Sequence, residues 1–161
     1  KLFSMQNNAS HLPEGTPTTA LFAGSFDPFT IAHASIVARA MPLFTNLVIA
    51  VGFNEHKKGL YSVAERVERI AKHYAHCSNI RVVSYNNLTM DFAKQIGANV
   101  IIKGVRNVKD FEYERQQADV NKQMGGIDTL FFFAEPHLES ISSSLVRELL
   151  HFGKDVSHLI I

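Results

Sequence analysis

The sequence predicts an α/β fold built on a doubly wound, five-stranded parallel sheet with helices on both faces. Two observations support this prediction. From Thr19 onward, short apolar runs alternate with segments whose apolar residues recur at helical spacing. The run Asn46–Gly52 is apolar on both faces, as in a strand covered by helices on both sides. Strands and helices in such alternation are typical of a parallel sheet.

The composition indicates one globular domain. Of the 161 residues, 46% are hydrophobic and 19% are charged, so we expect a substantial core. The net charge of +1 argues against a nucleic-acid partner held by a broad basic surface. The single cysteine, Cys77, cannot form an intrachain disulfide and favours a reducing, cytoplasmic location. No apolar run approaches the ~20 residues of a membrane span, so we expect no membrane association.

The expected elements follow one another from Thr19. Residues 1–18 show no periodicity, and we expect a flexible leader or expression remnant there, with a single domain at residues 19–161. The expected strands, each a short apolar run, are residues 19–23, 46–52, 80–84, 99–103 and 129–134. The expected helices, each with an apolar stripe, are residues 32–44, 62 to about 74, 89–96, 110–124 and 142–152.

Capping and breaking residues set several boundaries. Ser62 with Glu65 three residues later forms a capping-box pattern at the start of the second helix. Pro42 should end or bend the first helix near its C-terminus. Glycines at 97, 125–126 and 153 should end three later helices. The apolar stripe expected on the second helix comprises Val63, Val67, Ile70, Ala71 and Tyr74.

The carboxyl ends of the strands are the expected location of a ligand site, because doubly wound sheets bind ligands at that edge. The segments that follow the strands hold most of the unusual polar residues of the chain. These segments are residues 24–26, 53–58, 86–90, 103–106 and 136–144.

The stretch from Ala20 to His33 is the strongest single signal. It runs from an apolar strand through a turn at Gly24 into a helix, the arrangement in which backbone N–H groups and the helix dipole hold phosphate. Ser25 adds a hydroxyl to the turn. His33 stands at the helix entrance, where its ring N–H can reach a phosphate oxygen and a bound anion would favour its charged form. An isolated histidine would more often be a capping or partly buried residue.

Three further groups lie near the same edge. Lys57 and Lys58 follow the second strand; one of them is expected to be solvated, and a lysine on this loop could instead hold a substrate phosphate. Lys103 and Arg106 flank the end of the fourth strand, and an arginine suits bidentate phosphate contacts. The segment 141–147 places three serines at a helix start, followed by an arginine. These serines are either redundant N-caps or donors to a polyphosphate.

Two other clusters were considered as sites. His73 and His76 are spaced to share a helix face, but no third metal ligand follows, so a surface pair is favoured. Asp110 and Glu112 are interpreted as N-terminal helix charges, whereas Glu114 faces differently and could reach a ribose hydroxyl. We expect no metal ligand from protein side chains. The sequence contains no Walker loop, GxGxxG fingerprint or Ser-His-Asp order.

Residues 24–33 and 141–147 together resemble the nucleotidyltransferase superfamily, whose hallmarks are an (H/T)xGH motif and a serine-rich helix start. Residues 54–58, 103–106 and 110–114 are similar to those of bacterial phosphopantetheine adenylyltransferases. The resemblance extends from about Thr19 to the end of the chain and implies a Rossmann-like fold. It implies adenylyl transfer from ATP to 4′-phosphopantetheine, giving dephospho-coenzyme A and pyrophosphate. Mg²⁺ would assist, no covalent enzyme intermediate would form, coenzyme A is a further possible ligand, and the assembly would be a homohexamer.

The resemblance also implies site residues. Ser25 would contact ATP and the substrate phosphate, and His33 would stabilise the transition state at the α-phosphate. Lys57, which would hold the substrate phosphate, and Arg106, which would bind ATP, would complete the catalytic set. The other implied ATP-binding residues are Phe26, Gly104, Val105, Glu114, Leu138, Glu139, Ser140, Ile141, Ser142, Ser143 and Ser144. The other implied substrate-binding residues are Thr89 and Lys103.

Two residues depart from the family pattern. Ala32 replaces the glycine of (H/T)xGH, and we expect a helical conformation there that alanine accepts, with weakened binding at most. Lys103 replaces an arginine found in many relatives. It keeps the positive charge but lacks the forked guanidinium that binds phosphate in a bidentate way. The family also continues into another short C-terminal helix.

Two alternative functions stay open: a related nucleotidyltransferase with another acceptor, such as nicotinamide mononucleotide, and an inactive nucleotide- or coenzyme A-binding module.

Overall fold

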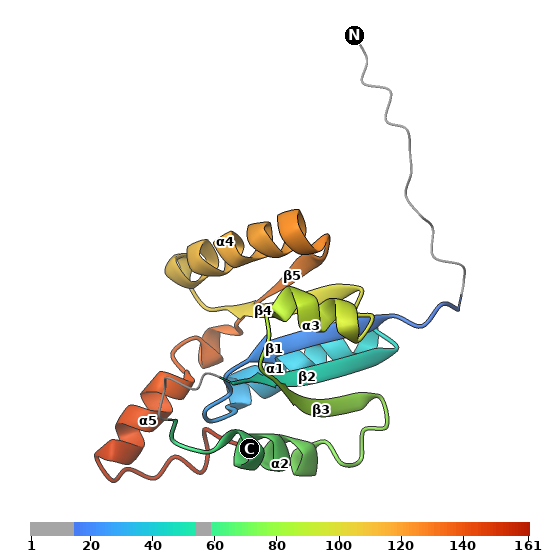
Figure 1. The fold of residues 1–161 in the computed structure, drawn as a ribbon. Coiled ribbons are helices and arrows are strands. Elements are labelled where there is room, and N and C mark those ends of the chain that lie inside the picture. The colour runs from blue at the N-terminus through green and yellow to red at the C-terminus, as the bar shows by residue number, and fades with distance from the viewer. Residues whose placement is uncertain (1–14, 54–58) are drawn as a thin grey trace.

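The computed structural model describes residues 15–53 and 59–161 and has the expected α/β architecture (Figure 1). Its five strands are β1 (Thr19–Gly24), β2 (Asn46–Gly52), β3 (Ile80–Tyr85), β4 (Val100–Val105) and β5 (Asp128–Phe133). Its α-helices are α1 (Ile31–Ala40), α2 (Val63–His73), α3 (Thr89–Gln95), α4 (Val108–Gly125) and α5 (Ser143–His151). Two short 3-10 helices, η1 (Met41–Leu43) and η2 (Pro136–Leu138), complete the described elements.

All strand pairs are parallel, and the order across the sheet is β3-β2-β1-β4-β5. The chain winds outward from β1 to β3, returns to the other side of β1 with β4, and continues to β5. The direction of winding therefore changes between β1 and β4, which is the position where doubly wound sheets bind ligands.

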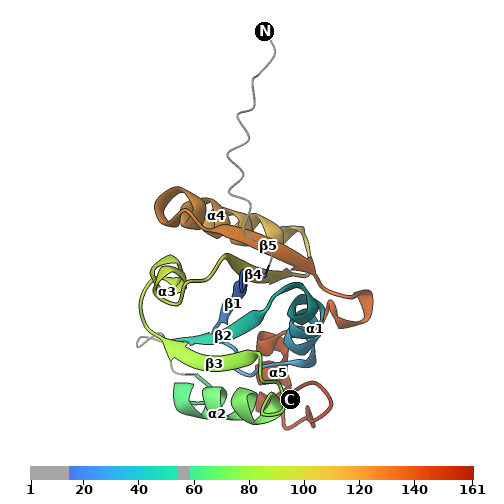
Figure 2. The same cartoon turned by 90° about the vertical axis from the view of Figure 1, so that its right-hand side faces the viewer.

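Alternate residues of the central strand enter two separate cores. Ala20 and Phe22 pack in a cluster with α1 and α2, whereas Leu21 and Ala23 pack in a cluster with α3. Figure 2 shows α1 and α3 on opposite sides of the sheet. Burial on both faces explains why the sequences of β1 and β2 are continuous apolar runs. Helix α4 packs against β4, β5 and α3.

The predicted capping and breaking signals are largely confirmed. Ser62 and Glu65 form a reciprocal capping box at the start of α2. Helix α1 ends at Ala40, and Pro42 lies in η1, so the helix stops before the proline. Ser142 is the N-cap of α5, with its hydroxyl accepting from the backbone N–H of Leu145.

Three details of the sequence prediction are wrong. Strand β4 continues through Gly104 and Val105, which were expected to form a turn, because they pair with Phe132 and Phe133 of β5. Helix α4 begins at Val108, two residues earlier than expected, because the Asn107 side chain accepts from the Asp110 backbone N–H. Ala71 was placed on the buried stripe of α2, but it is exposed. Of the expected leader, residues 1–14 lie outside the described residues.

Candidate active site

The loop between β1 and α1 contains a buried carboxylate, that of Asp27, which accepts hydrogen bonds from the segment before α2. The backbone N–H groups of Leu60 and Tyr61 donate to Asp27 at 2.7 and 3.0 Å, and the Asp27 residue is only 7% exposed. A Cβ atom on Gly59 would lie 2.7 Å from an Asp27 carboxylate oxygen, so this close approach requires glycine. Asp27 therefore fixes the β1–α1 loop against the segment that leads into α2.

Two helices also hold this loop through its carbonyl groups. From α2, Arg66 donates to the Ser25 carbonyl at 2.6 Å. From α5, Ser143 donates to the Pro28 carbonyl at 2.7 Å, and Arg147 donates to the Asp27 carbonyl at 2.7 Å. Arg147 therefore anchors the loop, a contact that no sequence pattern indicates. Phe26 takes a φ of 46° within the tightly held turn.

His33 is the third residue of α1 and belongs to a capping box with Thr30. The His33 backbone N–H donates to the Thr30 hydroxyl at 3.4 Å, and the Thr30 backbone N–H donates to His33 Nδ1 at 3.0 Å. Thr30 itself is fully buried. Because Nδ1 accepts a hydrogen bond, the proton of the neutral ring is on Nε2. His33 is therefore arranged as a hydrogen-bond donor through Nε2.

The surroundings of His33 favour its neutral form. Its ring centroid lies 5.1 Å from that of Phe26, 5.2 Å from that of Phe29 and 6.3 Å from that of Phe22. Burial, followed by the positive charge of Arg106, lowers the pKa of His33 from 6.5 to about 4. The sequence analysis linked a charged imidazole to a bound anion, and in the ligand-free protein the ring is held in its neutral form.

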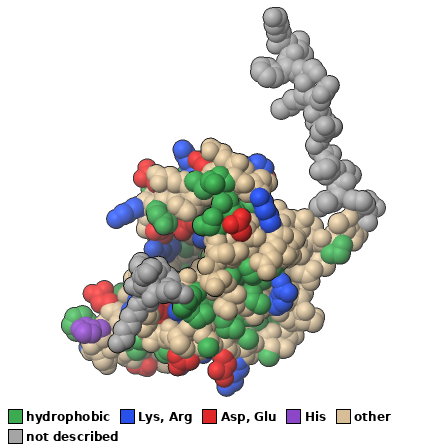
Figure 3. Space-filling view, in the orientation of Figure 1, with side chains coloured by type: hydrophobic (Ala, Val, Ile, Leu, Met, Phe, Trp, Pro, Cys, Tyr) green, Lys and Arg blue, Asp and Glu red, His purple; other side chains and the backbone are tan. Residues whose placement is uncertain are grey.

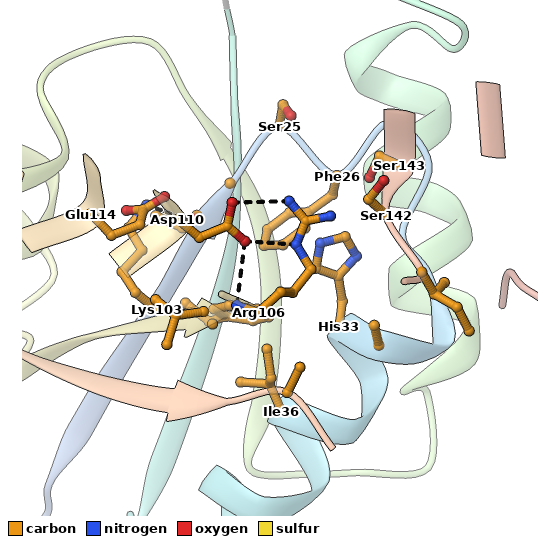
Figure 4. Close-up of a pocket in the computed structure, with 18 of the residues that line it drawn as sticks. Ser25, Phe26, His33, Ile36, Lys103, Arg106, Asp110, Glu114, Ser142 and Ser143 are labelled. Atoms are coloured by element: carbon orange, nitrogen blue, oxygen red, sulfur yellow. Dashed lines mark hydrogen bonds and ion pairs between the residues drawn. The ribbon is translucent and has the colours of Figure 1, made fainter. Parts of the chain in front are cut away.

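Two cations, Lys103 in β4 and Arg106 directly after it, each face a carboxylate of α4. Lys103 Nζ lies 3.5 Å from Glu114 Oε2 and donates to the Ala23 carbonyl at 3.3 Å. Arg106 donates from Nε and Nη2 to the two oxygens of Asp110, at 2.7 and 3.1 Å. Figure 4 shows the Arg106 guanidinium between Asp110 and the ring of His33.

A cavity of about 460 Å³ unites these groups at the carboxyl ends of β1 and β4. In Figure 3 a hollow lies between α4 and the lower part of the molecule. The predicted site residues that line the cavity are Ser25, Phe26, His33, Lys103, Gly104, Val105, Arg106, Glu114, Ile141, Ser142 and Ser143. Sequence reasoning missed several lining residues, namely Phe22, Ala23, Ile36, Asp110 as a pocket residue, Tyr113 and Ala134.

The remaining predicted site residues do not line this cavity. Thr89, at the start of α3, shares a hydrogen bond of 2.9 Å with the Tyr85 hydroxyl. Leu138 is buried in η2, and Ser144 accepts from Arg147 at 3.1 Å. Glu139 and Ser140 are exposed outside the lining. Lys57, with its neighbour Lys58, lies outside the described residues.

Ala32 lines the cavity as part of α1 and is buried. Its helical conformation agrees with the sequence prediction, and it is not among the non-glycine residues with positive φ. The backbone of α1 is therefore compatible with alanine at the position where the motif has glycine.

Within residues 15–53 and 59–161, no group of three or more histidine, cysteine, aspartate or glutamate side chains could hold a metal ion. The two carboxylates that line the cavity are each paired with a cation. Among the described helices, none combines the length and apolar character needed to cross a membrane.

Comparison with known proteins places this site in a family. The cytidylyltransferase-like family model matches residues 21–149. A phosphopantetheine adenylyltransferase from Porphyromonas gingivalis is 49% identical over 138 residues, which cover 86% of this chain and 90% of that protein. A phosphopantetheine adenylyltransferase from Bacteroides fragilis is 48% identical over 141 residues, covering 88% and 94%. The chain belongs to the phosphopantetheine adenylyltransferase family.

A solved structure shares the fold at much lower sequence identity. The bifunctional NMN adenylyltransferase/ADP ribose pyrophosphatase from Francisella tularensis aligns with a TM-score of 0.66 and 12% identity, over 90% of this chain and 45% of that one. At this identity the likeness concerns the fold alone. The chain thus shares its fold with this solved adenylyltransferase, and its own cavity lies at the winding switch of the sheet.

Proposed function

We propose that this chain transfers the adenylyl group of ATP to 4′-phosphopantetheine, giving dephospho-coenzyme A and pyrophosphate in coenzyme A synthesis. The observation that carries the proposal is the single cavity in which His33, Arg106 and Lys103 meet the serines at the start of α5. Names of relatives at 48–49% identity support the acceptor.

The reaction needs positioning more than a protein nucleophile. A phosphate oxygen of 4′-phosphopantetheine attacks the α-phosphorus of ATP, the bond from that phosphorus to the bridging oxygen breaks, and pyrophosphate leaves with the electron pair. Negative charge builds on the oxygens of the α-phosphate, where fixed donors lower the barrier. His33 Nε2–H is such a donor, because its Nδ1 is engaged by Thr30.

The cationic residues would divide between the two substrates. Arg106, together with backbone groups of Phe26, Gly104 and Val105, would bind ATP. Lys103 and Lys57 would bind the substrate phosphate, and Ser25 would contact both substrates. Thr89 would line the pantetheine channel.

The ribose and adenine contacts follow the family pattern. Glu114 Oε2 is buried, lies 3.5 Å from Lys103 Nζ and accepts no hydrogen bond from the described residues, so a ribose hydroxyl that reached it on binding would supply the missing donor. Residues 138–144 would bind the adenine and the polyphosphate. Of these, Ile141, Ser142 and Ser143 line the cavity in the ligand-free protein, and the other residues would have to approach on binding.

Mg²⁺ fits this site as an ion carried by the ATP polyphosphate, because the donor set offers no separate metal cluster within the described residues. When bound, it would supply charge neutralisation at the phosphate oxygens. Lys103, Arg106 and the N-terminus of α5 would supply the protein's share of positive charge.

We further propose a cytoplasmic homohexamer. Exposed apolar side chains on α4 and β5 support an assembly surface, and Figure 3 shows hydrophobic side chains on α4. The large apolar residues exposed on these elements are Val108, Tyr113, Val120, Met124, Leu130 and Phe133. A surface of this kind is typical of subunit contacts.

The deciding experiment measures pyrophosphate release in a coupled assay. We expect release from ATP only when 4′-phosphopantetheine is present, with Mg²⁺. Turnover with nicotinamide mononucleotide in its place would support the related nucleotidyltransferase. Tight coenzyme A binding without any turnover would support the inactive module.

A further inference from the structure

The two cations at the end of β4 and two carboxylates of α4 form two matched pairs inside the cavity. Lys103 lies in β4 and Arg106 directly after it, and their partners Asp110 and Glu114 lie one helical turn apart on α4. The cavity that is proposed to bind polyphosphate therefore contains two carboxylates of the protein itself. Glu114 has a proposed ribose partner, whereas the proposed function leaves Asp110 without one.

Asp110 occupies the donors with which an arginine binds phosphate. Its two oxygens accept from Arg106 Nε and Nη2 at 2.7 and 3.1 Å, and the Arg106 backbone N–H lies 3.3 Å from the same carboxylate. This is the bidentate geometry in which a guanidinium also binds phosphate. The fork of Arg106 cannot hold Asp110 and a ligand phosphate in the same way at once.

Asp110 is well placed to release Arg106. It is the third residue of α4, and its backbone N–H is capped by Asn107 at 2.9 Å. A carboxylate in the first turn of a helix is stabilised by the helix dipole. The Asp110 side chain is also 25% exposed, so water can solvate it when its partner leaves.

We propose that Asp110 is an internal competitor for Arg106, which weakens the binding of pyrophosphate-bearing ligands and speeds their release. A ligand phosphate must displace the carboxylate to reach the arginine fork. When product pyrophosphate begins to leave, Asp110 recaptures Arg106. This inference rests on the proposed function only in taking ATP and pyrophosphate as the ligands of Arg106.

The test measures inorganic pyrophosphate binding by isothermal titration calorimetry, in buffer without divalent cations. Asp110→Asn should bind pyrophosphate about tenfold more tightly than the native chain, because one charge-assisted bidentate pair no longer has to be broken. The rate at which pyrophosphate dissociates from this variant, measured by stopped flow, should fall by a similar factor. Asp119→Asn removes the same charge from an exposed position on the same helix, and it should change the affinity by less than twofold.

A second arm separates competition for Arg106 from simple charge repulsion. In an Arg106→Gln background, adding Asp110→Asn should leave pyrophosphate binding unchanged. An equal gain in both backgrounds would overturn the proposal, as would weaker or unchanged binding by Asp110→Asn, or no pyrophosphate binding by the native chain. Asp110→Ser carries the same expectation should the asparagine variant fail to fold.

The outcomes also separate this inference from the proposed function. Native turnover with 4′-phosphopantetheine but no gain in Asp110→Asn would overturn the inference alone. A clear gain in Asp110→Asn without native turnover would support the inference and contradict the proposed acceptor.

Discussion

At the scale of single residues, His33 shows how local structure selects a chemical role. The Thr30 backbone N–H fixes the tautomer of the ring, and three phenylalanine rings and Arg106 disfavour its charge. A neutral donor can strengthen its hydrogen bond as charge builds on the substrate, without first losing a proton. Its usefulness therefore does not depend on protonation near neutral pH.

We expect His33→Ala to lower kcat by about 10²–10³-fold, the usual loss for one donor to a developing oxyanion. His33→Gln should keep more activity than His33→Asn, because the glutamine amide reaches the position of Nε2 whereas the asparagine amide resembles Nδ1. Steady-state kinetics of the three variants check this. Equal activity of glutamine and asparagine variants would contradict the assigned tautomer.

The lowered pKa of His33 also predicts a change of stability with pH. The unfolded chain binds a proton near pH 6.5, and the folded chain does so only near pH 4. Below pH 6.5 the unfolded state therefore gains protons that the folded state does not, and stability falls until about pH 4. The contribution of His33 amounts to about 2 kcal/mol between pH 7 and pH 5.

Urea unfolding at the two pH values measures this difference. His33→Gln removes the titrating group, so its loss of stability between pH 7 and pH 5 should be smaller than the native loss by that amount. The same loss in both proteins would show that the pKa of His33 is near its ordinary value.

At the scale of elements, α1 packs closely against β4 at Gly104. A Cβ atom there would collide with Ile36 Cδ1, and Ile36 is buried at the wall of the cavity. We expect Gly104→Ala to cost about 1–3 kcal/mol of unfolding free energy through overpacking. Ile36→Val removes the colliding Cδ1, so the double variant should regain part of the loss. Urea unfolding of both variants tests the contact, and no recovery would contradict it.

The β1–α1 loop depends on α2 and α5 as much as on its own sequence. Asp27→Asn leaves one carbonyl oxygen for two backbone donors, Leu60 and Tyr61. We expect a loss of about 1–3 kcal/mol, the cost of leaving a buried donor unpaired. Chemical denaturation measures it, with Asp119→Asn as the charge-matched control. A loss no larger than the control's would show that the carboxylate does not hold the loop.

At the scale of the whole molecule, the proposed assembly predicts a mass. Light scattering after size exclusion should give six copies for the native chain. Val120→Glu with Met124→Glu places charges among the exposed apolar residues of α4 and should reduce that number. Ser157→Glu, in an exposed position near the C-terminus, serves as the control. A native monomer would contradict the assembly.

Much of the fold was predictable because its burial is regular. Central strands that are covered on both faces must be apolar throughout. The direction of winding changes between β1 and β4, and the cavity lies at that position. Gly104 misled the prediction because glycine is a common turn signal, whereas its strand pairing depends on Phe132, which is distant in the sequence. The Thr30–His33 capping box was missed because histidine rarely takes the place of glutamate in that pattern.

The pairing of Arg106 with Asp110 was also missed, although opposite charges four residues apart were visible in the sequence. Asp110 was interpreted as a helix charge alone, and the close pairing depends on how the end of β4 leads into α4. The anchoring of the β1–α1 loop by Arg66 and Arg147 joins residues 41 and 120 positions apart, and no local pattern indicates such contacts.

The bonds from Ser143 and Arg147 to the β1–α1 loop have a consequence for the order of biosynthesis. They join the last α-helix to a loop made about 115–120 residues earlier. At typical elongation rates of about 5–20 residues per second, the ribosome needs several seconds to supply the second half of the site. The β1–α1 loop of a nascent chain therefore lacks these two anchors until α5 has been made.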